Sequence, residues 1–219
     1  MKRQFVIIGC GRFGSSIAKT LYSMDHDVMI LDRSEERILE IADFVTHSAQ
    51  VDATDEKALR ALGIRNFDTA VISIGSDIQA SIMATLIAKE LGISNVVCKA
   101  QTELQAKVLY KIGADKVVFP ERDMGVRVAH NLVSKNVLEY IELDPNYSIV
   151  EIIVPKKWSN KSIKDLDLRA KYGINVMAVK SLQGINISPS ANVVLQEGEN
   201  LVVIGKNDVI KKIEEEDKK

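Results

Sequence analysis

Short, largely apolar runs alternate with longer amphipathic stretches through the first two thirds of the chain. A short apolar run is typical of a strand buried on both faces, whereas apolar residues spaced by three and four positions are typical of a helix. We expect strands at residues 5–8, 28–31, 45–48, 70–74, 96–98 and 117–119, and helices at 14–24, 35–41, 55–62, 78–91 and 103–112. This alternation predicts an α/β fold with a doubly wound, parallel, six-stranded sheet.

Polar residues and glycines mark the ends of two of these helices. Thr54 or Asp55 is placed to cap the helix that Gly63 ends, and Asp77 precedes the helix that Gly92 ends. Such polar side chains accept hydrogen bonds from the free N–H groups of a first turn, and glycine readily adopts the left-handed conformation that ends a helix. These residues support both helices independently of the apolar pattern.

A further helix is expected from Glu121 to about residue 135, with no parallel strand after it. Met124, Val128, Leu132 and Val133 form an apolar stripe along this helix at helical spacing. Two interpretations stay open. The stripe packs on the sheet of its own domain, or it crosses to a second copy of the chain.

After residue 136 the pattern changes to strand-like segments separated by Gly and Asn turns. Strands are expected at 137–143, 148–154, 175–181 and 200–204, a short helix at 163–170, and a last helix at 208–215. We therefore predict two domains, a larger α/β domain at 1–136 and a small α+β C-terminal subdomain at 137–219.

The turn after the first strand is rich in glycine. Gly9, Gly11 and Gly14 have the G-x-G-x-x-G spacing of a Rossmann strand–turn–helix unit, in which they permit a tight turn, let the backbone approach the phosphates, and let helix and strand pack closely. Asp32 ends the next apolar run, where a carboxylate accepts hydrogen bonds from ribose hydroxyls. The sequence thus predicts a site that prefers NAD(H) or ATP/ADP to NADP, although Arg33 leaves a 2′-phosphate possible.

The net charge and the two cysteines limit which partners and which kinds of site are expected. The formal net charge of −1 offers no general electrostatic reason to bind nucleic acid or an anionic membrane. No apolar run approaches the ~18 residues that span a bilayer, and the first residues show no signal-peptide plan, so a cytoplasmic location is expected. Cys10 and Cys98 predict neither a disulfide nor a zinc site. Cys10 either fills a tight turn or has a thiol activated by the adjacent helix N-terminus.

An oxidoreductase is the first alternative for such a fold. None of the five tyrosines is followed four residues later by lysine, the spacing of the acid/base pair in short-chain dehydrogenases. The chain also lacks a nucleophile elbow and a P-loop. His26 and His47 are placed as structural residues. We therefore expect a nucleotide-sensing protein that is not an enzyme, with a small NAD(P)-dependent oxidoreductase as the alternative.

Several motifs together resemble the RCK family, the cytosolic regulators of potassium channels and transporters of the Ktr and Trk types. In the first domain they are Ile8-Gly9-Cys10-Gly11-Arg12-Phe13-Gly14, Asp52-Ala53-Thr54, Ile74-Gly75-Ser76-Asp77, Lys99-Ala100, Gly113-Ala114-Asp115 and Phe119-Pro120-Glu121-Arg122. In the second they are Leu166-Asp167-Leu168-Arg169, Tyr172-Gly173-Ile174-Asn175, Pro189, Leu195, Gly198 and Leu201-Val202-Val203-Ile204-Gly205. One such pair of domains is similar to the single-unit Ktr type rather than the duplicated Trk type.

The resemblance implies a gating ring. Proteins of this family form dimers through their N-terminal domains and octameric rings beneath a membrane-embedded, potassium-translocating subunit, at the inner face of the cell membrane. ATP/ADP or NAD(H) in the Rossmann cleft favours different ring shapes and so changes ion flux.

Matched positions imply roles for individual residues. The nucleotide would contact Gly9, Gly11, Arg12, Phe13, Gly14, Asp32, Arg33, Asp52, Ala53, Thr54, Ile74, Gly75 and Lys99. The glycines would hold phosphates, Asp32 the ribose, and Asp52 and Ala53 the adenine. Val51 stands where many relatives have glycine, so the backbone before Asp52 is expected to differ from theirs.

Arg12, Glu121 and a second site complete the implied roles. In the family, the arginine that Arg12 matches reaches the terminal phosphate of a nucleotide in the neighbouring subunit; the alternative is its own pyrophosphate or solvent. Glu121 matches an acidic residue that helps to hold a divalent cation, or else it stabilises the first turn of its helix.

Some Ktr-type subdomains bind cyclic di-AMP between two copies. Here its site would comprise Arg169 and Asn175, with Ile163 and Pro189 as lining; the alternative is a folding core with a surface arginine.

Overall fold

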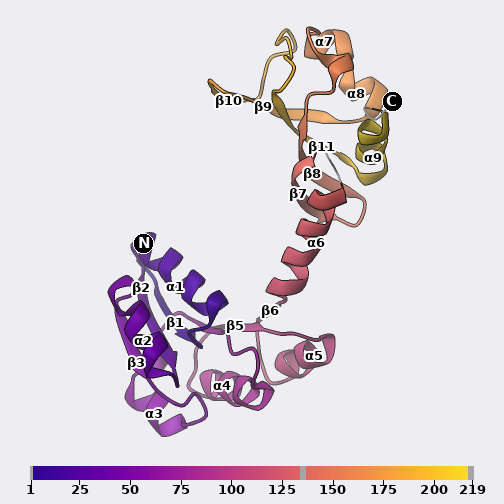
Figure 1. The fold of residues 1–219 in the computed structure, drawn as a ribbon. Helices are drawn as coiled ribbons and strands as arrows, with labels where there is room; N and C mark the ends of the chain where they lie inside the picture. Colours follow the sequence, from indigo (N-terminus) through magenta and orange to yellow (C-terminus); the bar gives the residue numbers. More distant parts are fainter. Residues whose placement is uncertain (1, 134–136, 217–219) are drawn as a thin grey trace. The chain divides into compact units, whose positions relative to one another are not determined.

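The computed structural model describes residues 2–133 and 137–216 (Figure 1). The chain divides into two compact units, Met1–Arg122 and Asp123–Lys219, each with its own sheet and apolar core. The domain limit expected after residue 136 adjoins 134–136, which lie outside the described residues, so that limit stays a prediction. Within the described part of the chain, no helix combines the length and the apolar character needed to cross a bilayer.

The first unit is built on a parallel, six-stranded sheet in the order β3-β2-β1-β4-β5-β6. Its strands are β1 (Gln4–Ile8), β2 (Asp27–Asp32), β3 (His47–Gln50), β4 (Thr69–Ile72), β5 (Asn95–Lys99) and β6 (Lys116–Val118). The strand order reverses between β1 and β4, and such a switch point is where open α/β sheets bind their ligands. The expected doubly wound fold is confirmed.

Helices cover both faces of this sheet (Figure 1). They are α1 (Arg12–Ser23), α2 (Glu35–Ile41), α3 (Glu56–Ala61), α4 (Ile78–Glu90) and α5 (Glu103–Lys111), with short 3₁₀ turns at Ala42–Phe44 and Ile64–Asn66; α6 (Pro120–Val133) follows β6. Because side chains alternate along a strand, Ile7 joins a core with α1 and α2, whereas Val6 and Ile8 join a second core with α3, α4 and α5.

The expected helix ends are confirmed, and the expected limits of β3 and β4 are wrong. Asp55 caps α3, and Asp77 caps α4 by accepting from the Ala80 N–H at 2.9 Å. β3 begins two residues later than expected, because the 3₁₀ turn first brings Val45 into the core. β4 ends at Ile72 instead of residue 74. Ser73, directly after it, keeps one backbone hydrogen bond to β1, from its N–H to the Ile8 carbonyl oxygen at 2.8 Å.

The second unit contains an antiparallel, five-stranded sheet in the order β10-β9-β11-β8-β7. Its strands are β7 (Val137–Asp144), β8 (Tyr147–Ile153), β9 (Asn175–Ser181), β10 (Gly184–Ile187) and β11 (Asn200–Lys206). The short, exposed edge strand β10 was not expected, because its exposed residues have no buried face to impose a pattern. The α+β class of this unit is otherwise as the sequence predicts.

The prediction of one continuous helix at 163–170 is wrong. The structure has α7 (Ile163–Leu166) and α8 (Leu168–Tyr172), with α9 (Asn207–Glu216) at the end of the chain. Asp167 separates α7 from α8 in the left-handed conformation, with φ of 47°, which aspartate tolerates better than most residues. This break brings both Leu166 and Leu168 into the core around Trp158.

Candidate nucleotide-binding site

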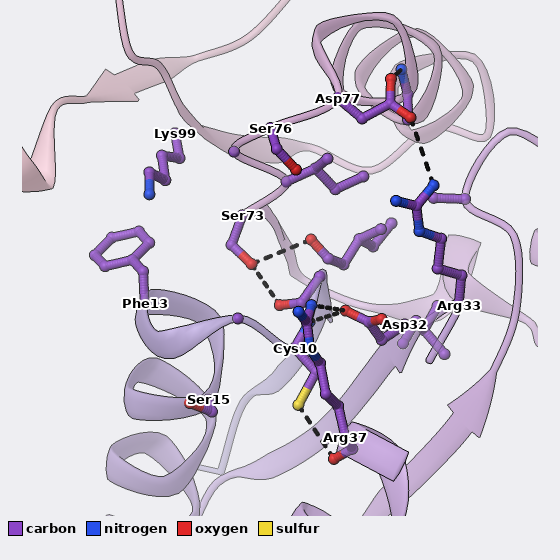
Figure 2. A pocket seen from close by; sticks show the side chains of 18 of the residues that line it. Cys10, Phe13, Ser15, Asp32, Arg33, Arg37, Ser73, Ser76, Asp77 and Lys99 are labelled. Atoms are coloured by element: carbon purple, nitrogen blue, oxygen red, sulfur yellow. Dashed lines mark hydrogen bonds and ion pairs between the residues drawn. The ribbon is translucent and has the colours of Figure 1, made fainter. Parts of the chain in front are cut away.

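A cleft of about 760 Å³ opens at the carboxyl ends of β1, β2, β4 and β5, at the switch point of the sheet (Figure 2). All of the residues expected to contact a nucleotide line this cleft except Gly14. Glu121 also lines it. The fold thus brings together residues from the glycine turn, from the ends of separate strands and from the start of α6.

The glycine turn has the geometry that phosphate binding requires. Gly9 has a φ of 107°, which disfavours any residue with a Cβ atom. Gly11 is the N-cap of α1, and a Cβ atom there would meet no protein atom within 4 Å. The first N–H groups of α1 have no side-chain cap within the described residues and face an open space. An anion fits this space, because a helix N-terminus has a partial positive charge.

Gly14 lies behind the cleft, where α1 packs against the sheet. A Cβ atom on Gly14 would lie 2.0 Å from the Gly9 carbonyl oxygen and 2.4 Å from Ser73 Oγ. The absence of a side chain therefore permits the close approach of α1 to β1 and β4. This is the packing role that the motif assigns to its third glycine.

Asp32 is held in place at the end of β2. Its side chain is 8% exposed, and its Oδ2 accepts a hydrogen bond of 2.6 Å from the Cys10 N–H. Oδ1 accepts from the Ser34 N–H at 2.8 Å. Each carboxylate oxygen has a second acceptor position. The carboxylate can therefore receive two ribose hydroxyls without giving up its protein contacts.

Two arginines flank this carboxylate, and sequence reasoning found only one of them. Arg33 Nη1 lies 3.7 Å from Asp77 Oδ2, at the start of α4. Arg37 Nη1 lies 3.8 Å from Asp32 Oδ2 and also lines the cleft. Arg37 was not predicted, although the sequence places it in the first turn of α2, shortly after Asp32. Positive charge near Asp32 lowers the electrostatic barrier to an additional phosphate on the ribose.

The opposite end of the cleft contains a cluster of charged residues. Lys99 has a side chain only 10% exposed and donates a hydrogen bond to Glu121 Oε1. This hydrogen bond lowers the pKa of Glu121, and the Arg12 charge contributes a smaller effect in the same direction. Among the described residues, the Arg12 guanidinium forms no ion pair. Lys99 was expected in the cleft and Glu121 near a subunit interface, and their pairing was not predicted.

The turn after β3 forms the end of the cleft at which adenine is expected. Asp52 Oδ1 accepts from the Thr54 N–H at 2.9 Å and from the Thr54 hydroxyl at 2.8 Å. These two hydrogen bonds lower the pKa of Asp52. Ala53 and Thr54 line the cleft as expected. The remaining oxygen of Asp52 is available to accept from an amino group.

The residues after β4 form the wall between these two ends. Ile74 and Gly75 lie there as expected. Ser73 also lines the cleft, and its hydroxyl donates to the Gly9 carbonyl oxygen at 2.5 Å. Sequence reasoning assigned Ser73 to the strand. A hydroxyl residue at the end of an apolar strand is the sequence feature that could have indicated this role of Ser73.

Neither cysteine has the character of a reactive thiol. Burial raises the pKa of Cys10, and the nearby Asp32 charge raises it further. The expectation of a thiol activated by the helix N-terminus is therefore wrong, and the alternative of a small residue in a tight turn holds. Burial raises the pKa of Cys98 to about 11, and its thiol lies 3.3 Å from Thr85 Oγ1 in the core.

The four residues expected at a second ligand site lie in the second unit. Ile163 begins α7 and packs against the core, and Pro189 follows β10. Arg169 on α8 and Asn175 at the start of β9 are exposed. Their exposure leaves both polar side chains accessible, but their assignment to a ligand stays a prediction.

Comparisons with known proteins identify the family. The TrkA-N domain matches residues 5–120, and the TrkA-C domain matches residues 148–217. The chain is 48% identical to Ktr system potassium uptake protein C of Bacillus subtilis, over 94% of this chain and 93% of that protein. The chain belongs to the Ktr potassium uptake protein family. Ktr system potassium uptake protein A of the same organism is 46% identical over 98% of this chain and 96% of its own length.

Solved structures agree on the fold of this Ktr-family chain. The GsuK channel superposes with a TM-score of 0.70 at 18% identity, over 98% of this chain and 39% of the channel. The RCK domain of GsuK gives a TM-score of 0.67, also at 18% identity, over 98% of this chain and 47% of that structure. The expected resemblance to the single-unit Ktr type is confirmed by the TrkA-N and TrkA-C matches and by the two Bacillus subtilis proteins.

Proposed function

We propose that this Ktr-family chain is the nucleotide-sensing, regulatory subunit of a potassium-uptake system and not an enzyme. The observation that carries the proposal is the cleft at the switch point, with a glycine turn, a buried carboxylate and a cationic end in one continuous space. The relatives that match nearly the whole chain are named potassium uptake proteins. Its location would be cytoplasmic, at the inner face of the membrane beside an ion-translocating partner.

We place an adenine nucleotide in this cleft in one orientation. Gly11 and the start of α1 would hold the phosphates, Asp32 would accept the ribose hydroxyls, and Asp52 would accept from the adenine amino group. Arg12 and Lys99 would then lie at the end where the terminal phosphate differs between ATP and ADP. A structure of related fold, the GsuK channel, is bound to NAD. It supports a dinucleotide as a further ligand of this fold.

Assembly would connect the ligand to ion flux. Met124, Val128 and Leu132 on α6 are 52%, 47% and 81% exposed in the single chain. Of the two interpretations of this stripe, the proposal takes the one in which it crosses to a second copy, as the dimers implied by the family resemblance would require. Dimers formed in this way would assemble into an octameric ring beneath the membrane subunit.

Two further ligands belong to the proposal. A divalent cation at Glu121 would compete with Lys99 for the carboxylate, so binding of the cation would release Lys99 toward the phosphates. Cyclic di-AMP would bind the second unit at Arg169 and Asn175, beside Ile163 and Pro189. Both rest on family resemblance together with the accessibility of these side chains.

Calorimetric titration with ATP, ADP, NADH and cyclic di-AMP, run beside light scattering, tests the proposal. We expect saturable binding of ATP or ADP without turnover, and a mass well above that of one chain. A monomer that binds no adenine nucleotide at micromolar concentration would overturn the proposal. Hydride transfer to a carbonyl or imine substrate would instead favour the oxidoreductase alternative.

The role of Arg12 can be separated from general charge effects. A guanidinium that contacts a terminal phosphate adds a charge-assisted hydrogen bond only to ATP, so Arg12→Ala should weaken ATP binding about tenfold and ADP binding much less. Calorimetry measures both affinities, and Arg65→Ala, which changes an exposed residue outside the cleft, is the control. Equal losses for ATP and ADP would contradict a terminal-phosphate contact.

A further inference from the structure

The peptide unit between Gly9 and Cys10 is held at both of its polar ends. Its N–H, on Cys10, donates to Asp32 Oδ2 at 2.6 Å, and its carbonyl oxygen, on Gly9, accepts from Ser73 Oγ at 2.5 Å. Figure 2 shows both interactions as dashed lines at the centre of the cleft. Asp32 ends β2 and Ser73 follows β4, the two strands that flank β1. The glycine turn is thus fixed from either side.

The Ser73 hydroxyl donates its hydrogen bond to the Gly9 carbonyl oxygen and not to the Ile8 carbonyl oxygen. A serine hydroxyl has one proton to donate. The Ile8 carbonyl oxygen is farther from Ser73 Oγ, at 3.2 Å, and already accepts from the Ser73 N–H at 2.8 Å. Ser73 is buried, so its removal would leave the Gly9 carbonyl in a poorly solvated space. An unpaired polar group in such a space costs free energy.

Gly9 is the residue at which this peptide unit is free to rotate. Its φ of 107° and its lack of a Cβ atom permit backbone conformations that other residues avoid. Rotation of the unit would withdraw the Cys10 N–H from Asp32 and shift the turn that leads directly to Gly11, the N-cap of α1. The first N–H groups of α1, which would hold the phosphates, would then lose their alignment.

We infer that Ser73 is a positioning residue for phosphate binding, which acts with Asp32 to fix the Gly9–Cys10 peptide unit before a nucleotide arrives. The inference rests on the proposed function and adds to it a residue that acts through the glycine turn. When the turn is already fixed, binding of the ligand loses no conformational entropy in ordering it. Ser73 should therefore matter for ligands with phosphates and matter little for a nucleoside.

The test compares ADP with adenosine on Ser73→Ala. Loss of the hydroxyl should weaken ADP binding about tenfold and adenosine binding about twofold or less. Ser81→Ala removes a buried hydroxyl that has no hydrogen-bond partner within the described residues, and should change neither affinity. Thr85→Val removes a buried hydroxyl that donates to the Ser81 carbonyl, so it controls for a loss of stability outside the cleft.

The outcomes separate this inference from the function on which it rests. If the wild-type protein binds no ADP, both are overturned. If it binds ADP, and Ser73→Ala reduces ADP and adenosine binding equally or behaves as Thr85→Val does, the positioning role alone is overturned. Should Ser73→Ala fail to fold, hydrogen exchange on the nucleotide-free wild type decides. Slow exchange of the Cys10 amide supports the inference, and fast exchange overturns it.

Discussion

Gly11 and Gly14 belong to one motif but meet different physical constraints. Gly11 faces the open cleft, whereas a side chain on Gly14 would collide with the Gly9 carbonyl at 2.0 Å. The collision involves backbone, which cannot move away as a flexible side chain can. One glycine of the motif is therefore open to a ligand, and the other serves the fold.

The two glycines should separate stability from binding. Gly14→Ala is expected to lower the free energy of unfolding by about 3 kcal/mol, because it overpacks the contact between α1 and the sheet. Gly11→Ala should change it by less than about 1 kcal/mol, the scale of an N-cap effect, yet weaken ADP binding by crowding the phosphates. Urea denaturation and calorimetry measure the two quantities. Similar losses of stability in both variants would contradict these assignments.

At the scale of elements, the loop after α5 is tied to β5 by one carboxylate. Asp115 Oδ2 accepts from the Val96 N–H at 2.7 Å and from Lys89 Nζ at 3.1 Å. The hydrogen bond from the Val96 backbone is the main cause that lowers the pKa of Asp115, and Lys89 adds to it. Because β5 carries Lys99 at its other end, this tie also supports the cleft.

The stability of the fold should depend on pH because Asp115 accepts these hydrogen bonds as a carboxylate. A carboxyl with a lower pKa in the folded than in the unfolded state stabilises the fold above its ordinary pKa of about 3.9, and this contribution is lost as pH falls through the folded value. Asp115→Asn should therefore lower the free energy of unfolding by about 1 kcal/mol at pH 7, with a smaller difference below pH 4. Urea denaturation at several pH values measures it, with the exposed Asp43→Asn as control. A difference that is constant with pH would refute this account.

At the scale of the whole molecule, two units with separate cores imply two separable ligand responses. The candidate nucleotide cleft is lined by residues of the first unit, and the four residues of the proposed cyclic di-AMP site lie in the second. A ligand reduces local opening where it adds contacts, and distant backbone responds only through coupling.

Hydrogen–deuterium exchange should map these responses. ADP is expected to slow exchange in the glycine turn and in the residues after β2 and β4, because these segments would contact it. Cyclic di-AMP should instead slow exchange around Arg169 and Asn175. Adenosine monophosphate serves as a control for cyclic di-AMP at the second site. Protection of the second unit by ADP alone, with no change in the glycine turn, would contradict the assignment of the cleft.

The features predictable from the sequence were those set by neighbouring residues. Apolar periodicity indicated the order and class of the elements, and the spacing of Gly9, Gly11 and Gly14 before Asp32 indicated the cleft, because turn conformation and strand burial depend on short segments. The break at Asp167 and the edge strand β10 were missed, since each depends on what a short segment packs against.

Only the tertiary structure could decide which distant residues meet. Ser73 contacts a carbonyl 64 positions earlier in the chain, and Lys99 pairs with a carboxylate 22 positions later. Such contacts depend on strand order, register and the angle at which a helix leaves the sheet, and no local pattern encodes these. The sequence by itself determined that a glycine turn with the spacing of a phosphate-binding motif follows the first strand. The packing of β2 and β4 against β1 decided how firmly that turn is held, because only there do Asp32 and Ser73 reach one peptide unit.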